Sequence, residues 1–266
     1  LKGDVFDAVM NYRWYRAARH FFNRSPDKIT VSEFVDSLNR FRSNIRPENN
    51  YAMMNLAASH DAPRVLTSLF NKNAYKYNAK PAQDESYKIH KPDAETYETL
   101  KLLLAQQFTY IGSPHIWAGD EMGMWGADDP STRKPLIWKD YDFEDETTHP
   151  LGQERPTDKV EFNDELFDYY RHLIKIRNEN PVLASGDLEY LIVDDDGKIL
   201  AYSRFDDEDE VIAVFNTSNE VQAIEIPVKF EGEYVELLNG LAAAAKSGSS
   251  IIVELPARQT AIFASQ

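Results

Sequence analysis

The first two thirds of the chain alternate between two hydrophobic patterns. Short apolar runs rich in β-forming residues predict buried strands. The longer stretches that follow them begin at polar capping residues and carry apolar residues at helical spacing, which predicts helices. The strands are expected at residues 5–12, 51–58 and 114–118, and the helices at about 31–45, 94–108 and 164–177. A strand followed by a helix, three times over, is typical of βα units around a parallel sheet.

The pattern changes after Asn180-Pro181, which ends the last of these helices. Beyond it lie short segments of alternating apolar and polar residues, separated by turn signals such as Asn239-Gly240. Seven strands are expected, at 188–193, 199–205, 211–216, 221–226, 234–238, 251–255 and 260–264. Several short strands at this spacing predict an antiparallel β-sandwich. We therefore expect an α/β part at residues 1–181 and an all-β domain at residues 182–266.

Composition narrows the range of partners more than it defines a function. Asp and Glu number 44 against 29 Lys and Arg, so the formal net charge is −15. The negative potential of such a charge opposes binding of nucleic-acid phosphates and anionic membranes but allows a neutral sugar. A need for solubility would by itself also explain the acidic composition. The absence of cysteine excludes disulfides, thiolate metal sites and cysteine nucleophiles. We expect neither a nucleic acid nor a membrane as a partner, because no apolar run reaches the roughly 18 residues of a membrane span.

The dipeptide His60-Asp61 is the first candidate for chemistry, because it follows the second expected strand. In a (β/α)8 barrel the catalytic groups lie at the C-terminal ends of the strands. A carboxylate there would face a pocket where a sugar or a metal could bind. The alternative is structural: Asp61 would cap a helix starting near Pro63, and His60 would be a core histidine. These two residues alone leave both interpretations open.

Four segments in register add a family resemblance. They read FDAVMNY at 6–12, NLAASHDAPR at 55–64, GSP to GDEMGM between 112 and 124, and DDPSTRKPL at 128–136 followed by Trp138. Together they resemble glycoside hydrolase family 13, the α-amylase family, and its neopullulanase- and cyclomaltodextrinase-like members. The resemblance implies the C-terminal part of a (β/α)8 TIM barrel, strands 6–8 with their helices, followed by the family's antiparallel β-sandwich domain.

The resemblance also implies roles for individual residues. Asp61 would be the third carboxylate of the site, binding the 2- and 3-hydroxyls of the sugar at the cleavage point and stabilising the transition state. His60 would bind the same hydroxyls, and Tyr12 is expected to contact substrate. Asp129 and Arg133 would hold the next glucose, because a planar guanidinium can donate two bonds to vicinal hydroxyls. The alternative for Arg133 is a surface ion pair with a neighbouring aspartate.

Aromatic residues near Arg133 are candidates for stacking on sugar rings. Trp125 and Trp138 suit this role because the apolar face of glucose packs on aromatic rings, although both could instead anchor the loop. The tyrosines of the long polar stretch 71–93 could stack as well, or the stretch could be a solvated lid. Trp117-Ala118 stands where the family usually has two tyrosines, which leaves linkage and chain-length preference open.

The resemblance places two of the three catalytic carboxylates outside the chain. A retaining glycosidase needs a nucleophile and an acid/base about 5 Å apart, and the family's Asp and Glu for these roles would lie upstream of Leu1. We expect the parent protein to hydrolyse α-1,4 or α-1,6 glucosidic bonds in maltodextrin, cyclodextrin or pullulan-like glucans, and this chain alone to be inactive. The alternatives are a glucanotransferase of the same superfamily and a non-catalytic glucan-binding fragment.

Three barrel strands cannot close a barrel, and they leave an open sheet edge. We expect another chain, which could be a second copy, or a collapsed loop to cover that edge. No cofactor is expected, although calcium remains possible in the parent. The acidic stretches Asp194–Asp196 and Asp206–Glu210 are explained better as solvated turns than as calcium sites.

Overall fold

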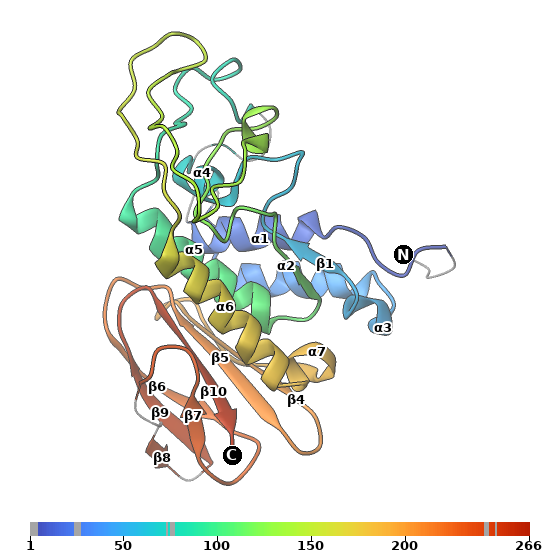
Figure 1. The fold of residues 1–266 in the computed structure, drawn as a ribbon. Coiled ribbons are helices and arrows are strands. Elements are labelled where there is room, and N and C mark those ends of the chain that lie inside the picture. Colours follow the sequence, from blue (N-terminus) through green and yellow to red (C-terminus); the bar gives the residue numbers. More distant parts are fainter. Residues whose placement is uncertain (1–4, 24–27, 73, 75–77, 242–244, 248) are drawn as a thin grey trace.

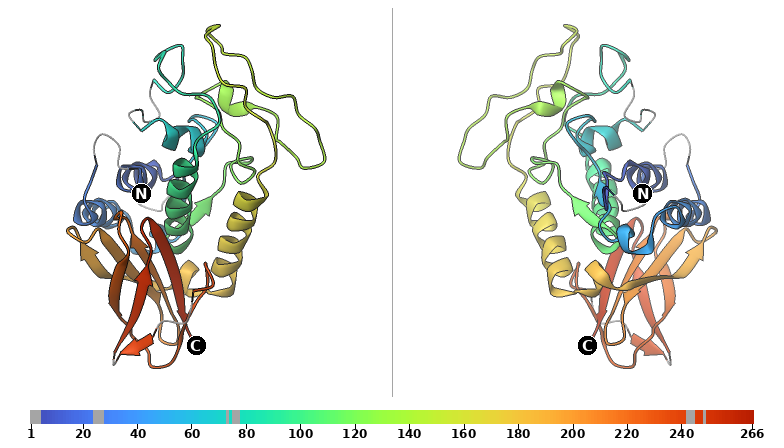
Figure 2. Two further views of the ribbon diagram at one scale, coloured as in Figure 1. Left: turned by 90° about the vertical axis from the view of Figure 1, so that its left-hand side faces the viewer. Right: turned by 90° about the vertical axis from the view of Figure 1, so that its right-hand side faces the viewer.

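The computed structural model describes residues 5–23, 28–72, 74, 78–241, 245–247 and 249–266. Helices pack against a short parallel sheet in the first part of the chain, and a two-sheet β-sandwich follows (Figure 1). The two further views show the sandwich packed beneath the helices, while the long segment between β2 and α6 extends away from the sandwich (Figure 2). Within the described ranges, none of the helices combines the length and apolar character needed to cross a bilayer.

The parallel sheet is short. Its strands are β1 (Met54–Leu56) and β2 (Ser113–His115), paired in parallel register. Met10 adds an isolated parallel bridge to Met54. The strand expected at 5–12 is otherwise wrong, because Asn11 caps helix α1 (Tyr12–Phe22) by accepting a hydrogen bond from Trp14 N at 3.2 Å. The Arg- and aromatic-rich sequence that follows is thus helical.

The other expected helices are confirmed, together with their capping residues. Thr30 and Glu33 form the predicted capping box, and the side chains of Asp93 and Asn163 each accept a backbone hydrogen bond at the start of their helices. The long helices are α2 (Val31–Ser43), α5 (Ala94–Thr109) and α6 (Asp164–Glu179). The shorter ones are α3 (Pro47–Asn50), α4 (Val65–Phe70), α7 (Val182–Ser185) and the 3-10 turn η1 (Ser131–Arg133).

The predicted antiparallel sandwich is confirmed, with one extra strand, β8. One sheet has the order β3-β4-β5-β10-β7, and the other has the order β6-β9-β8. The strands are β3 (Asp187–Asp194), β4 (Ile199–Phe205), β5 (Glu210–Asn216), β6 (Gln222–Pro227), β7 (Tyr234–Glu236), β8 (Ala245–Ser247), β9 (Ser250–Leu255) and β10 (Gln259–Ser265). Every residue of β5 is buried, because the helices cover one face of its sheet and the second sheet covers the other.

A buried arginine connects the two parts. Arg204 on β4 donates hydrogen bonds to the carbonyls of Thr109 at 3.0 Å, Leu183 at 2.9 Å and Gly186 at 2.8 Å. These bonds tie the ends of α5 and α7 to the sandwich, and they offset the cost of burying the charge. The expected division at residues 181 and 182 lies in the connection between α6 and β3, and its position stays a prediction.

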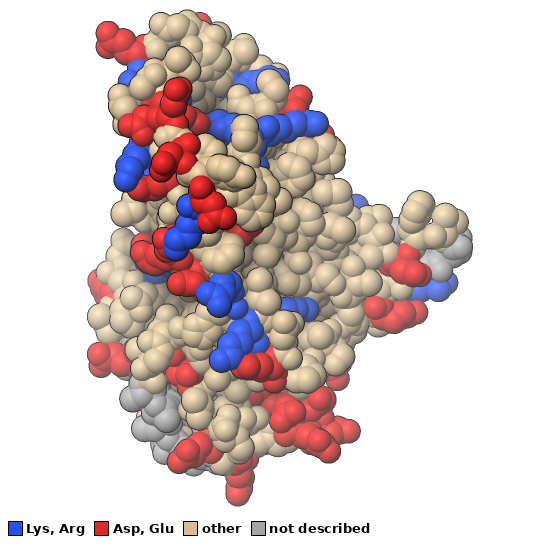
Figure 3. Space-filling view, viewed as in Figure 1, with Lys and Arg blue, Asp and Glu red and all other residues tan. Residues whose placement is uncertain are grey.

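Charge is spread over the surface. In the face of Figure 3, acidic side chains gather on the flank of the long segment between β2 and α6 and again around the lower end of the sandwich. Asp194 and Asp206 accept hydrogen bonds from backbone amides in their own turns, as is usual for solvated Asp-rich turns. Among the described residues, no three His, Asp or Glu side chains come together as metal ligands would. Any calcium requirement of the parent stays a prediction.

Candidate functional site

His60 and Asp61 lie in the loop between the C-terminal end of β1 and the start of α4. Two hydrogen bonds hold this loop in place. Tyr12 and Ser59 share a hydrogen bond between their hydroxyls at 2.7 Å, and Asp61 N donates to Ser59 Oγ at 3.1 Å. Tyr12, expected to contact substrate, therefore lies half-buried under this loop at the first turn of α1. The carboxyl end of a parallel strand is where barrel enzymes carry their reactive groups.

The structure contradicts the purely structural interpretation of Asp61 and His60. Helix α4 begins at Val65 with Arg64 as its N-cap and no side-chain capping bond, so Asp61 does not cap it. His60 is no core residue either, because its side chain is 52% exposed and that of Asp61 is 63% exposed. His60 Nε2 and Asp61 Oδ2 lie 3.3 Å apart, and both side chains are open to a ligand.

Asp129 and Arg133 lie beside this pair although they are about 70 residues away in sequence. Arg133 Nη2 donates to the carbonyl of His60 at 3.3 Å, and its Nε lies 2.6 Å from Asp129 Oδ1. The ion pair between Arg133 and a neighbouring aspartate is thus present, but both side chains are about half exposed, so it adds little stability. The residues His60, Asp61, Asp129 and Arg133, here called the His60–Arg133 group, form one cluster of hydrogen-bonding side chains.

A buried arginine sets the position of this group. The guanidinium of Arg64 donates to the carbonyls of Ala118 at 2.6 Å and Thr132 at 3.0 Å, and it lies 3.2 Å from Asp120 Oδ1. It thereby joins the segments after β1 and β2 to the turn η1. Burial raises the pKa of Asp120 to about 7, with the Arg64 guanidinium opposing the shift. Sequence reasoning assigned Arg64 no role, although a charged residue beside Ala62-Pro63 in an apolar block was a usable signal.

The aromatic candidates lie in different surroundings. Trp125 is only 3% exposed, and its indole Nε1 donates to Glu146 Oε2 at 3.2 Å. Lys91 and Lys134 lie over its ring, at 5.8 and 5.6 Å from the centroid. Trp125 therefore anchors the segment between β2 and α6 and does not join the His60–Arg133 group. Trp138 is half exposed, and its stacking on a sugar stays a prediction.

The polar stretch 71–93 reaches the same group from another side. The amide of Asp128 donates to the carbonyl of Ala79 at 2.9 Å, and Lys80 Nζ donates to the carbonyl of Asp129 at 3.0 Å. Ala79 and Lys80 of this stretch therefore lie next to Asp128 and Asp129. Tyr75 and Tyr77, two of its candidate stacking residues, lie outside the described residues.

Comparison with known proteins decides the family. The profile described as alpha amylase, catalytic domain, matches residues 1–186, and the one described as alpha amylase, C-terminal all-beta domain, matches residues 190–266. The chain belongs to the α-amylase family. Its two parts are accordingly the C-terminal portion of the family's (β/α)8 barrel and its β-sandwich, as the resemblance implied.

Curated and solved relatives agree with this family. The chain is 32% identical over 257 residues to a cyclomaltodextrinase of Geobacillus thermopakistaniensis, covering 96% of this chain and 36% of the relative. It is 28% identical to neopullulanase 2 of Thermoactinomyces vulgaris, covering 93% of this chain and 35% of the relative. A solved cyclomaltodextrinase superposes with a TM-score of 0.71 at 25% identity, over 98% of this chain and 37% of its own. The chain thus spans about a third of the length of these relatives.

Proposed function

We propose that this chain supplies the sugar-binding side of an α-glucan hydrolase site, with Asp61 as its transition-state stabiliser. The observation that carries the proposal is the His60–Arg133 group, in which residues from two distant segments meet at the carboxyl end of a parallel strand. The names of the relatives, cyclomaltodextrinase and neopullulanase among them, support α-glucans as the substrate class.

Each member of the group has a role that its chemistry allows. Asp61 accepts hydrogen bonds from the 2- and 3-hydroxyls of the sugar at the cleavage point, and these bonds strengthen as the ring flattens toward the oxocarbenium-like transition state. The His60 ring binds the same hydroxyls. Arg133 and Asp129 hold the neighbouring glucose. The guanidinium of Arg133 presents donors and the carboxylate of Asp129 presents acceptors, and the two groups lie side by side.

We also propose that the chain by itself binds glucans without cleaving them. Hydrolysis with retention needs two further carboxylates about 5 Å apart across the scissile bond. The described contacts of the Asp61 side chain and amide are with His60 and Ser59. Moreover, the side chain of Asp61 is more than half exposed, so water competes for every hydrogen bond that a sugar would make there. These features support weak binding, in the millimolar range, by the isolated chain.

Titration of the 15N-labelled chain with maltotriose tests the proposal. We expect the amide resonances of His60 and Asp61 to shift, and Arg133→Ala to weaken binding several-fold. The control is Arg171→Ala, which removes another exposed arginine from an ion pair, with Asp168 on α6, and should leave binding unchanged. Equal weakening by both variants, or no shift at His60 and Asp61, would refute the assignment. Cleavage of maltotriose that disappears in Asp61→Asn would refute the inactivity of the chain.

A further inference from the structure

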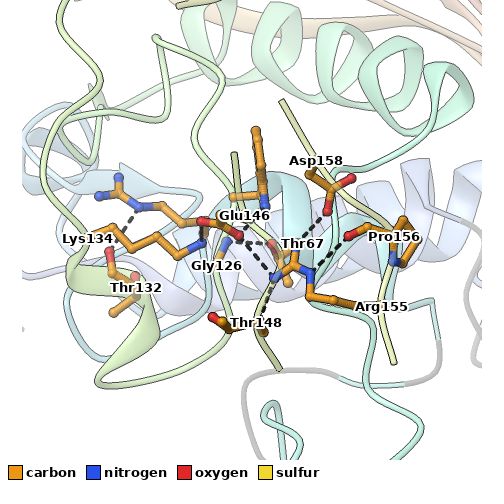
Figure 4. Close-up of polar contacts among 11 residues, drawn as sticks. Thr67, Gly126, Thr132, Lys134, Glu146, Thr148, Arg155, Pro156 and Asp158 are labelled. Atoms are coloured by element: carbon orange, nitrogen blue, oxygen red, sulfur yellow. Dashed lines mark hydrogen bonds and ion pairs between the residues drawn. The ribbon is translucent and has the colours of Figure 1, made fainter. Parts of the chain in front are cut away.

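Two adjoining, partly open hollows of about 180 and 300 Å³ lie in the segment between β2 and α6, with Ile89 of the stretch 71–93 also lining the larger one. This segment runs from residue 116 to residue 163 and has η1 as its one helical turn, so side-chain contacts and the backbone bridge between Glu146 and Asp158 hold its shape. Lys134 and Glu146 line both hollows. The two hollows therefore meet at this ion pair, which Figure 4 shows at the centre of a wider polar network.

The smaller hollow is walled mainly by apolar side chains. Trp125 and Phe143 contribute aromatic rings, and Ile137 and Val160 contribute aliphatic surface. Met124 and Pro135 add apolar surface, and the charged members of the lining are Lys134, Glu144 and Glu146. A small pocket with apolar walls and a few polar groups is suited to a compact ring that has an apolar face.

The lining of the larger hollow includes groups that can exchange hydrogen bonds with hydroxyls. Ser131 and Thr148 contribute hydroxyls, and His149 contributes its ring. His149 Nδ1 accepts a hydrogen bond from Leu151 N at 3.2 Å, so in the neutral ring Nε2 carries the proton and can donate. This hollow thus offers both donors and acceptors beside the apolar one.

The charges between the hollows compensate one another. Glu146 accepts from Lys134 and Trp125 and lies 3.2 Å from Arg155 Nη1, and Arg155 also pairs with Asp158 (Figure 4). Two cations therefore face two carboxylates, and this network has no net charge to attract an anion or a cation. The hydroxyls and the His149 ring of the larger hollow instead favour a neutral, hydroxyl-rich ligand.

From these features together we propose that the two hollows form a second binding site for a neutral carbohydrate, with one pyranose ring in the apolar hollow and a linked unit in the polar one. This site goes beyond the proposed function, because it uses none of the His60–Arg133 group. Arg133 contacts His60, while the next residue, Lys134, contacts Glu146. The segment around η1 therefore separates the two sites, and a sugar held at Lys134 would restrain Arg133.

The test is titration of the 15N-labelled chain with maltose, read at the indole N–H resonance of Trp125 and assigned with Trp125→Phe. We expect this resonance to shift in the wild type and in Arg133→Ala, with binding in the millimolar range. Val160→Phe fills the apolar hollow and should abolish the shift. The matched control, Val221→Phe, changes an exposed valine beside β6 and should leave the shift intact.

A second variant provides an independent test in case Val160→Phe does not fold. Phe143→Ala removes one wall of the apolar hollow and should weaken maltose binding at least several-fold. An unmoved Trp125 resonance, or a shift that survives both variants, would overturn the second site while leaving the shifts at His60 and Asp61 as a separate result. A Trp125 shift produced by benzylamine or glucose 1-phosphate but not by maltose would overturn the neutral carbohydrate as its ligand.

Discussion

At the scale of single residues, the His60–Arg133 group depends on a side chain that does not belong to it. Arg64 is 2% exposed and binds the carbonyls of Ala118 and Thr132 as well as Asp120. We expect Arg64→Met to lower the free energy of unfolding by about 3–5 kcal/mol, because it leaves a buried carboxyl and two carbonyls without their donor. Urea unfolding followed by circular dichroism measures this, and Arg171→Met, in an exposed pair, should have little effect.

The loss of unfolding free energy caused by Arg64→Met should depend on pH. Burial already holds the pKa of Asp120 at about 7, above the ordinary range of an aspartate. A raised folded-state pKa means that the contribution to stability is complete below the unfolded pKa near 4 and is lost as the pH rises through 7. Without Arg64 the folded pKa rises further, so Arg64→Met should cost more at about pH 8 than at about pH 5. An equal cost at both pH values would contradict this account.

Gly119 is the second residue on which the site depends. Its φ is +101°, and a Cβ there would lie 2.3 Å from Met124 Sδ and 3.0 Å from Leu136 Cδ2. Gly119→Ala should therefore destabilise the chain by more than the roughly 1 kcal/mol of backbone strain alone. Gly240→Ala isolates that strain, because Gly240 also has a positive φ, of +65°, but has no atom within 4 Å of its Cβ position. Thermal unfolding that gave the two variants equal midpoints would exclude the steric contribution.

At the scale of elements, the helices were predictable because their capping residues are local signals. Asp93 is an example: its side chain accepts hydrogen bonds from the Thr96 amide at 2.9 Å and the Thr96 hydroxyl at 2.7 Å. Partial burial raises the pKa of Asp93, but these bonds, with help from Lys72 and Lys88, outweigh it and leave the pKa below its usual value. The sequence around residue 93 therefore specifies where α5 begins.

Replacement of this cap should be measurable. We expect Asp93→Ala to cost about 1 kcal/mol of unfolding free energy. Because the folded-state pKa is lowered, the ionised cap stabilises the chain above the unfolded pKa near 4, and its contribution is lost as the pH falls through the folded value. Asp168→Ala, in the middle of α6, is the matched control. A cost that persisted unchanged at about pH 2 would contradict the role of the charge.

The elements that were not predictable depend on distant contacts. The segment 5–12 has the composition of a buried strand, but in the described chain it pairs with β1 only around Met10. Val5 is 79% exposed and Phe6 is 68% exposed, since no neighbouring element covers them. Hydrophobicity therefore indicated that the segment should be buried, while the packing partner that would make it a full strand was not visible in the sequence.

At the scale of the whole molecule, the parallel sheet leaves apolar surface uncovered. Val5, Phe6, Val9, Met10 and Met54 are all exposed around its edge, and a hollow of about 660 Å³ lies beside them. An exposed apolar sheet edge favours pairing with another chain. We expect the isolated chain to self-associate through this surface.

Light scattering at several concentrations tests the association. The chain should be larger than a monomer, and Phe6→Glu combined with Val9→Glu should shift it toward the monomer, because two like charges would face each other across the contact. Val221→Glu, which changes an exposed valine beside β6 in the sandwich, should leave the association intact. A compact wild-type monomer at every concentration would contradict the prediction.

By itself, the sequence determined the order and type of most elements, the sandwich, and the family. The elements and the sandwich depend on hydrophobic period, capping residues and turn signals, all of which act between residues close together in the chain. The family was indicated instead by the four segments that resemble it. It also indicated that His60 and Asp61 follow a strand, which is again a local statement.

Only the tertiary structure decided which residues meet. Arg133 reaches His60, Lys80 reaches Asp129, and Trp125 turns to Glu146 instead of joining the site, because hydrogen bonds between distant segments set these positions. Such contacts leave no periodic trace in a sequence. The geometry of the site and the two hollows at Lys134 therefore follow from packing, whereas the architecture that carries them follows from local pattern.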